Sequence, residues 1–180
     1  MAVSAETRRR FLFIFGVDLW ERNTLFIVRG LPGSGKSTFC NRFLRGILHY
    51  ENDMFQMDGL KYDFRGERQR NCIDFCYRAV SMAIENFGAT VAVSNTFTVP
   101  KYLDEYYSLA ARNGWQCATF RMEGIFGNEH AVPQDVLDSM ARNFDVIESE
   151  IRVIPTEHGY DFRRFPVGTP SEFLHIEDGD

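Results

Sequence analysis

The sequence predicts an α/β fold in which helices cover both faces of a mostly parallel β-sheet. Strand-like apolar segments alternate with amphipathic helix-like segments from residue 24 to residue 151, which is the order that strand–helix–strand units produce. The first strand-like segment is apolar throughout, as expected of a parallel strand buried on both faces. The chain has 180 residues, 44% of them hydrophobic. It is therefore long enough to form one domain with a substantial core.

The expected strands are short apolar segments that end at glycine or polar residues. The first ends at Gly30, and the second is followed by the polar residues from Glu51 onward. The expected strands are residues 24–30, 89–96 and 115–122, with a further short apolar strand at the start of residues 47–59.

The expected helices are bounded by recognisable start and stop signals. Gly46 ends the first, proline opens the third and fourth, and Asn113-Gly114 closes the third. The helices are expected at residues 36–46, 67–88, 100–114 and 133–151. In the second, the predicted core stripe is Cys72, Phe75, Cys76, Ala79, Ala83 and Phe87.

The two ends of the chain differ from this pattern. Near the N-terminus, three arginines precede an apolar run that Asp18 and Glu21 interrupt. This run is too short to span a membrane, and we expect a strand or helix packed on the domain rather than a targeting segment. After Pro155 the sequence is polar and is expected to dock loosely or fray.

Charge and cysteine content narrow the possible functions. The formal net charge is −5, which argues against a broad electrostatic contact with nucleic acid but leaves room for a small basic site. Cys72 and Cys76 have helical rather than metal-binding spacing, and Cys40 and Cys117 are distant in sequence. We expect free thiols in a reducing compartment.

Residues 30–37, Gly-Leu-Pro-Gly-Ser-Gly-Lys-Ser, match the phosphate-binding pattern G-x-x-x-x-G-K-[ST] in full. The glycines let consecutive backbone N–H groups face one anion, while Lys36 supplies a cation and Ser37 a hydroxyl ligand for Mg²⁺. An apolar strand precedes the loop and an amphipathic helix follows it. The predicted nucleotide-binding residues are Leu31, Pro32, Gly33, Ser34, Gly35, Lys36, Ser37 and Thr38.

Phosphoryl transfer also needs a carboxylate that orients or deprotonates an acceptor hydroxyl. In an open α/β sheet this group belongs at the carboxyl end of a strand near the loop. Asp53 follows the second predicted strand and is the candidate catalytic base. Glu51 and Asp58 compete for this role, and a solvated loop acid is the alternative for each.

Four stretches together resemble the polynucleotide 5′-hydroxyl kinase branch of the P-loop kinases and related small AAA-type ATP-binding proteins. They are the loop itself and residues 51–64, 91–116 and 127–140, the last containing the pattern N-x-H-x-V-P. The resemblance covers about residues 25–145. It implies a P-loop NTPase three-layer sandwich that uses ATP and Mg²⁺.

The resemblance also implies individual roles. Asp53 falls on the family's general base, which takes the proton of the acceptor 5′-hydroxyl. Lys36 falls on the catalytic lysine and Ser37 on the Mg²⁺ ligand. Asn95 and Thr96 would orient the acceptor or Mg²⁺-bound water, with capping of a strand end as the alternative.

The sequence departs from the family at two places where cations are expected. Gln56 stands where the phage members carry an arginine that contacts the acceptor, and Gly127 stands where an arginine normally lies in a lid over the ATP phosphates. Loss of such a cation slows transfer by orders of magnitude. Arg121 is the expected substitute at the phosphates. Lys61 or Arg65 would serve the acceptor, and His130 is interpreted as structural.

The combined interpretation is a cytoplasmic ATP-dependent kinase with no membrane partner. Its acceptor would be the 5′-hydroxyl of a nucleic-acid end or a nucleotide-like molecule. Two alternatives stay open, a nucleotide-binding switch or interaction module with little activity and a small-molecule kinase. The expected organisation is an N-terminal extension at residues 1–23, a P-loop kinase-like domain at 24–155 and a C-terminal tail at 156–180.

Overall fold

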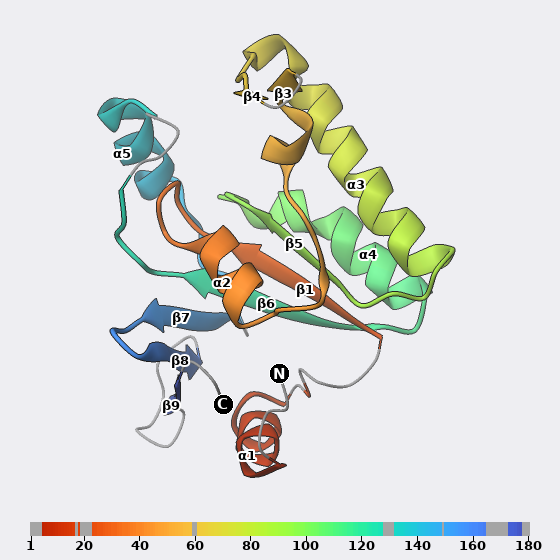
Figure 1. The fold of residues 1–180 in the computed structure, drawn as a ribbon, viewed down its shortest axis with the longest axis vertical. Coiled ribbons are helices and arrows are strands. Elements are labelled where there is room, and N and C mark those ends of the chain that lie inside the picture. Colours follow the sequence, from red (N-terminus) through yellow and green to blue (C-terminus); the bar gives the residue numbers. More distant parts are fainter. Residues whose placement is uncertain are drawn as a thin grey trace.

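Helices and strands alternate along most of the chain (Figure 1). The computed structural model describes residues 5–16, 18, 23–58, 61–127, 132–148, 150–164 and 173–177. The α-helices are α1 (Ala5–Phe15), α2 (Lys36–Arg42), α3 (Gln69–Glu85), α4 (Asp104–Arg112) and α5 (Gln134–Arg142). Short 3₁₀ helices are η1 (Asn52–Phe55), η2 (Gly66–Arg68) and η3 (Pro100–Leu103). The strands are β1 (Thr24–Arg29), β2 (Leu48–Tyr50), β3 (Met57–Asp58), β4 (Lys61–Tyr62), β5 (Val91–Asn95), β6 (Gln116–Met122), β7 (Ile151–Pro155), β8 (Gly159–Arg164) and β9 (Phe173–Glu177).

The main sheet of the described residues has the strand order β2-β5-β1-β6-β7-β8-β9. The pairs from β2 to β7 are parallel, whereas β8 and β9 pair antiparallel. Strands β3 and β4 form a separate hairpin. Because β2, β5, β1 and β6 run parallel, the loop that follows β1 opens at the same end of the sheet as the segments that follow the other three.

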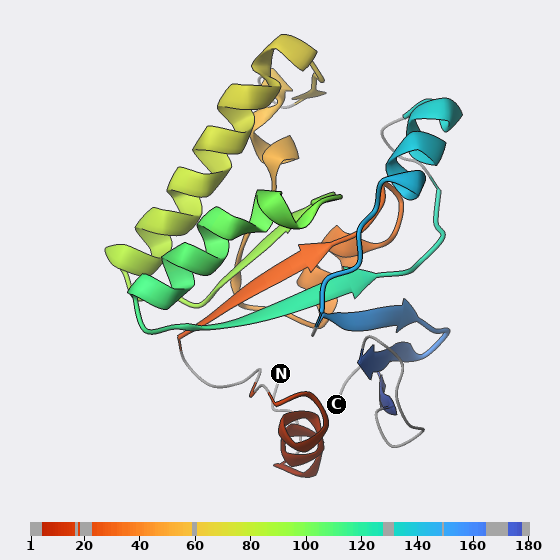
Figure 2. The same ribbon diagram turned by 180° about the vertical axis from the view of Figure 1, so that it is seen from behind.

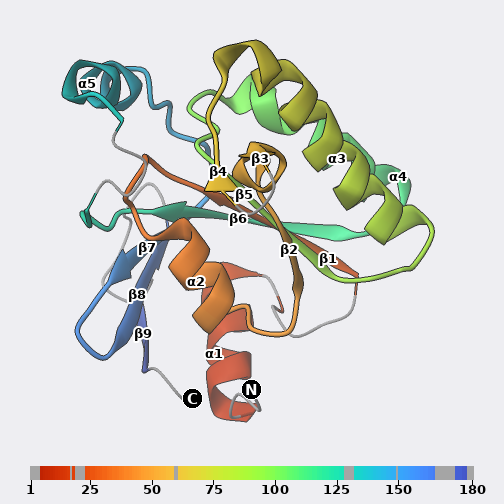
Figure 3. The ribbon, with the colours of Figure 1, turned by 45° about the horizontal axis from the view of Figure 1, so that its top comes forward.

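Helices lie on both faces of this sheet, as predicted. Strand β1 alternates between two cores: Phe26 and Val28 belong to one, and Leu25 and Ile27 to the other. The first core contains residues of α1, α2 and the sheet, many of them aromatic, and the second contains residues of the sheet, α3 and α4. Helices α3 and α4 lie side by side on one face of the sheet (Figures 2 and 3). These four side chains of β1 are all fully buried. The three-layer α/β sandwich is therefore confirmed.

The helix predicted over residues 133–151 is wrong in length. Helix α5 ends at Arg142, and strand β7 begins at Ile151. The side-chain amide of Asn143 binds the Ser139 carbonyl, while the backbone N–H of Asp145 donates to the Thr98 carbonyl at 2.8 Å. The helix therefore ends early because the residues after it bond to a segment that is distant in sequence.

The predicted stripe of α3 is also partly wrong. Phe75 and Phe87 are 53% and 73% exposed, and Val80 and Ile84 are buried beside the cysteines and Ala83. Phe75 instead turns toward Phe55 of η1, with ring centroids 6.1 Å apart. The other predicted helices and strands match their predicted positions to within about four residues at each end, whereas β3, β4 and β7 were not predicted.

Both end segments contribute secondary structure. Helix α1 places Phe11 and Phe15 in the first core, where Phe11 meets the Phe162 ring edge-on at 5.4 Å. Strands β8 and β9 lie in the segment expected to fray and extend the sheet instead. The sequence did not signal β8 because its residues, Gly-Tyr-Asp-Phe-Arg-Arg, include three charged side chains and form no continuous apolar segment. The domain boundaries themselves stay a prediction. No helix in the described part of the chain has the length and apolar content that crossing a bilayer requires.

The four cysteines are free thiols, and we predict that they resist alkylation in the native protein. Burial raises the pKa of Cys40 and of Cys117 to about 12 and that of Cys76 to about 11. Since the thiolate is the reactive form, iodoacetamide at pH 8 should modify these three at least ~10²-fold more slowly than free cysteine. Intact-mass spectrometry measures this, and four adducts should form in guanidinium. Rapid native labelling of Cys40 would contradict the buried position of α2.

Candidate active site

The phosphate loop connects β1 directly to α2. Gly33 and Gly35 have φ of 75° and 89°, in the left-handed region that favours glycine. A Cβ atom on Gly35 would lie 2.9 Å from the Phe126 ring, so this position has no room for a side chain. The loop thus takes the form that its glycines predict.

Lys36 folds back over this loop. Its Nζ donates to the carbonyls of Gly30 at 3.0 Å and Leu31 at 2.9 Å. Burial lowers the pKa of Lys36 to about 8, and the negative charges of Glu51 and Asp53 oppose this shift. Both acids that follow β2 are therefore close enough to act on the lysine electrostatically.

Glu51 makes the direct contact with the loop. Its Oε2 accepts a hydrogen bond from the Ser37 hydroxyl at 2.8 Å and one from the Ser94 hydroxyl at 3.1 Å. The His49 ring lies 2.8 Å from the Ser94 hydroxyl and 3.8 Å from Glu51 Oε2. Glu51 was one of the alternatives to Asp53 as the catalytic base. Its neighbours His49 and Ser94 belong to no sequence motif, so the sequence did not identify them as site residues.

Asp53 lies in the first turn of η1, two residues beyond Glu51. This turn is fastened to the end of β5, because the Asn52 N–H donates to Asn95 Oδ1 at 2.8 Å. The Gly30 N–H in turn points to the Thr96 carbonyl at 3.4 Å. Asn95 and Thr96 therefore meet the elements that hold Asp53 and the loop, and in this structure they do so through contacts with the backbone.

The donor set fits a nucleotide with Mg²⁺. The Ser34 hydroxyl is buried within the loop and has no hydrogen-bond partner among the described residues. One hydroxyl and two carboxylates stand near the loop lysine, and Mg²⁺ prefers such oxygen ligands together with phosphate oxygens. Ser37 and an acid after β2 would hold the ion.

A buried arginine fastens the loop to two other segments. Arg29 immediately precedes the loop, and its Nη1 contacts Glu150 Oε2 at 2.9 Å with both side chains fully buried. Its Nε donates to the Phe97 carbonyl at 3.0 Å. Its Nη2 donates to the Thr98 carbonyl at 3.1 Å and the Asp145 carbonyl at 2.9 Å. Sequence reasoning missed this cluster, although an arginine ending an apolar strand was a possible signal.

Arg121, the expected substitute for the lid arginine, belongs to the same cluster. It pairs in register with Arg29 across β1 and β6. Its guanidinium lies 3.4 Å from Glu123 and 3.5 Å from Glu150, and 4.8 Å from the centre of the Phe144 ring. A role at the phosphates requires Arg121 to leave these partners, and that role stays a prediction.

Gln56 stands where the family carries an acceptor-binding arginine, and its side chain makes hydrogen bonds that hold the fold together. It is buried, and its amide binds Gln69 at 3.1 Å and accepts from the Arg65 N–H at 3.3 Å. It therefore connects the β3–β4 hairpin to α3. The Arg65 side chain is exposed and pairs with Asp63 at 2.6 Å. The side chain of Lys61 lies outside the part that the structure describes.

The segment after β6 lies against the phosphate loop. The Phe126 N–H donates to the Gly33 carbonyl at 2.9 Å, and the Phe126 ring lies beside Gly35. Gly127, the position of the absent lid arginine, is exposed. Asn128 and His130 of the N-x-H pattern lie outside the described residues.

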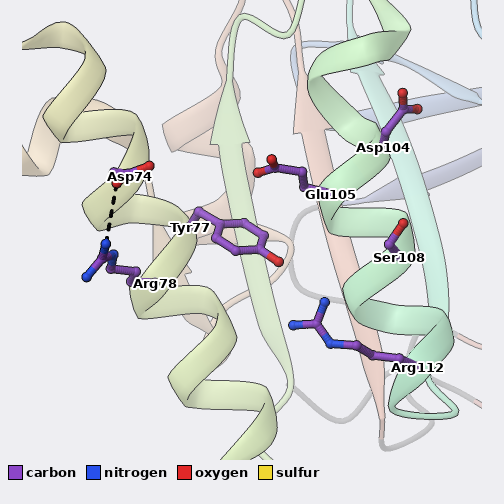
Figure 4. A pocket seen from close by; sticks show the side chains of 7 residues that line it. All are labelled: Asp74, Tyr77, Arg78, Asp104, Glu105, Ser108 and Arg112. Atoms are coloured by element: carbon purple, nitrogen blue, oxygen red, sulfur yellow. Dashed lines mark ion pairs between the residues drawn. The ribbon is translucent and has the colours of Figure 1, made fainter.

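A groove of about 470 Å³ lies away from this site, between α3 and α4 (Figure 4). Its lining is mostly charged and includes the exposed ion pair of Asp74 with Arg78 at 3.6 Å. None of the predicted site residues lines it. The candidate active site is therefore the end of the sheet where the loop, Glu51 and Asp53 meet.

Comparison with known proteins gives similarities of fold. No family model matches the chain. The uncharacterized protein PM0531 of Pasteurella multocida (strain Pm70) is 27% identical over 151 residues, which are 74% of this chain and 84% of that protein. A gluconokinase from Sinorhizobium meliloti 1021 matches with a TM-score of 0.51 and 14% identity, over 84% of this chain and 87% of that chain.

A chain of the Pnkp1/Rnl/Hen1 RNA repair complex also matches, with a TM-score of 0.51 and 16% identity. The match covers 72% of this chain and 46% of that one, so this chain spans less than half of the matched chain. This chain therefore shares its α/β fold with these two solved structures.

Proposed function

We propose that this protein is an ATP-dependent kinase that transfers the γ-phosphate of ATP to the 5′-hydroxyl of a nucleic-acid end or of a nucleotide-like acceptor. One observation supports this above others: the loop lysine and the two acids after β2 converge at one end of the sheet. A phosphate-binding loop alone accounts for nucleotide binding. Transfer to a hydroxyl also needs a group that orients or deprotonates that hydroxyl, and a carboxylate beside the loop supplies it.

Each residue has a defined part in this proposal. The loop amides and Lys36 hold the β- and γ-phosphates and stabilise the charge that moves between them. Asp53 accepts the acceptor's hydroxyl proton as that oxygen forms a bond to the γ-phosphorus. The bond from the γ-phosphorus to the β–γ bridging oxygen breaks, and ADP leaves. Mg²⁺, when bound, would neutralise charge on the phosphate oxygens.

The surroundings of Asp53 favour a nucleic-acid acceptor. Exposed apolar side chains lie on η1, on the hairpin segment and at the start of α3, namely Met54, Met57, Phe64 and Phe75. Arg65 and Arg70 are exposed on the same elements. Aromatic rings and arginines together stack on bases and neutralise phosphates, which is how single strands are bound without base-specific contacts. The resemblance of residues 25–145 to polynucleotide kinases points the same way.

Parallel transfer assays test the proposal. Purified protein with γ-³²P-ATP and Mg²⁺ is offered 5′-hydroxyl oligonucleotides of DNA and RNA, nucleosides, gluconate and water alone. We expect label on the oligonucleotide 5′ ends. Lys36→Ala should weaken ATP binding about 100-fold by calorimetry, because charge-assisted contacts to phosphate contribute about 1.5–3 kcal/mol each. Lys101→Ala, which removes an exposed lysine of η3, is the matched control.

The outcomes separate the competing functions. Label on nucleosides or gluconate but not on oligonucleotides identifies a small-molecule kinase. Tight ATP binding without transfer to any acceptor indicates a nucleotide-binding switch or interaction module. Unchanged ATP binding in Lys36→Ala contradicts the assignment of the loop itself.

A further inference from the structure

We infer that Glu51 supplies the carboxylate that positions Mg²⁺ at the nucleotide site, which leaves Asp53 for the acceptor proton. The inference rests on the proposed function and divides the two acids between two tasks. P-loop enzymes generally hold Mg²⁺ with the serine or threonine of the loop and an acid from a neighbouring strand. In this chain the acid comes from the end of β2.

The strands next to β1 do not supply this acid at Ser37. Strand β5, on one side, ends in Ser94 and Asn95. On the other side, Glu123 follows β6 and is bound to Arg152 at 2.7 Å and lies 3.4 Å from Arg121. Within the described residues, Glu51 is the carboxylate that contacts the Ser37 hydroxyl, at 2.8 Å.

The environment of Glu51 holds its carboxylate in place while one oxygen stays available. The Ser37 and Ser94 hydroxyls both donate to Oε2, and no described residue hydrogen-bonds to Oε1. The side chain is 23% exposed, so a cation or its bound water can reach it. A hydroxyl and a carboxylate oxygen less than 3 Å apart fit neighbouring positions around an ion that prefers oxygen ligands.

Asp53 is placed differently. It lies two residues further along, in η1, and the Asn52 N–H between the two acids is bonded to Asn95 Oδ1 at 2.8 Å. This bond fixes the residue between the two acids, while Glu51 contacts Ser37 and Asp53 lies on η1, which also carries the exposed Met54. The chain geometry therefore separates a metal-side acid from an acceptor-side acid.

Nucleotide binding with and without Mg²⁺ tests this assignment without measuring activity. The affinity for the non-hydrolysable analogue AMP-PNP is measured by calorimetry in Mg²⁺ and in EDTA. For the native protein we expect Mg²⁺ to tighten binding at least tenfold. Glu51→Gln should reduce this enhancement to less than threefold and leave the EDTA affinity unchanged or stronger. Asp53→Asn and Asp58→Asn, which make the same charge change, should retain the enhancement.

A wild-type measurement covers the case in which Glu51→Gln does not fold. Fe²⁺ replaces Mg²⁺ in the presence of AMP-PNP, and ascorbate with peroxide then cleaves the backbone beside the bound metal. We expect cuts next to Ser37 and next to Glu51, identified by mass spectrometry. Cuts at Ser37 without cuts at Glu51 overturn the inference.

The failures of the inference and of the proposed function are distinguishable. A Glu51→Gln variant with the native Mg²⁺ enhancement overturns the inference and leaves the kinase proposal standing. An equal loss in Asp53→Asn overturns the division between the two acids. Absence of AMP-PNP binding by the native protein in either buffer overturns the proposed function and the inference with it.

Discussion

Replacing Asp53 by asparagine should slow phosphate transfer to the acceptor about 10³-fold while changing the affinity for ATP less than threefold, because a general base typically contributes 10²–10⁴-fold to the rate. Asparagine keeps the size of the side chain but accepts no proton. Asp53 also acts on Lys36 electrostatically, so a small change in ATP affinity is expected. Single-turnover transfer from γ-³²P-ATP, together with calorimetry, measures the two effects separately.

Asp58→Asn is the control for this experiment, since Asp58 is an exposed acid five residues further along the chain. It should transfer phosphate at the native rate. If Asp53→Asn keeps the native rate while Glu51→Gln loses it with its Mg²⁺ enhancement of AMP-PNP binding intact, the base is Glu51. The structure makes that exchange a real alternative, because Glu51 is the acid that contacts Ser37.

Much of the fold follows from local signals in the sequence. The apolar segments predicted the strands of the parallel sheet because such strands are buried on both faces, and the glycine loop predicted the turn at residues 30–35. The end of α5 was not predictable locally, because residues 143–150 have no breaker and the contacts that unwind them come from Thr98 and Arg29. Strands β8 and β9 likewise depend on pairing with β7.

The candidate site, like the fold, could be predicted from the sequence only in part. Motif spacing identified the loop and the two acids after β2, but spacing alone could not choose between Glu51 and Asp53. That choice depends on where a short strand and one turn of 3₁₀ helix place each carboxylate. Hydrogen bonds from Ser37, Ser94 and Asn95 set that position. These hydrogen bonds join residues that are 14 or 43 positions apart, so no local sequence pattern records them.

Replacing Glu150 by alanine should lower the free energy of unfolding by about 3–5 kcal/mol, the usual effect of removing one partner from a buried ion pair. The Arg29 guanidinium would then stay buried without its carboxylate. For a protein of this size the loss corresponds to a fall in Tm of about 6–20 °C. Urea unfolding followed by circular dichroism measures the free energy. Glu148→Ala, an exposed acid in the same segment, is the control and should change it by less than about 0.5 kcal/mol.

The double variant Arg29→Met with Glu150→Met separates the ion pair from the other contacts of the arginine. Removing both charges should restore part of the stability, because a buried pair replaced by apolar residues is often neutral. Recovery should be incomplete, since Arg29 also binds the carbonyls of Phe97, Thr98 and Asp145. A single Arg29→Met variant as stable as the native protein would contradict this account.

Hydrogen exchange can locate the damage in Glu150→Ala. Phe97 is held at a φ of 42°, unusual for a bulky side chain, and its carbonyl accepts from Arg29. Loss of Glu150 weakens the anchor of that arginine, so faster exchange is expected at residues 96–98 and 144–148 and in the phosphate loop. Helix α1, which packs in the opposite aromatic core, should exchange at its native rate. Uniform acceleration throughout the chain would instead mean that the ion pair stabilises the fold without specifically fastening the loop.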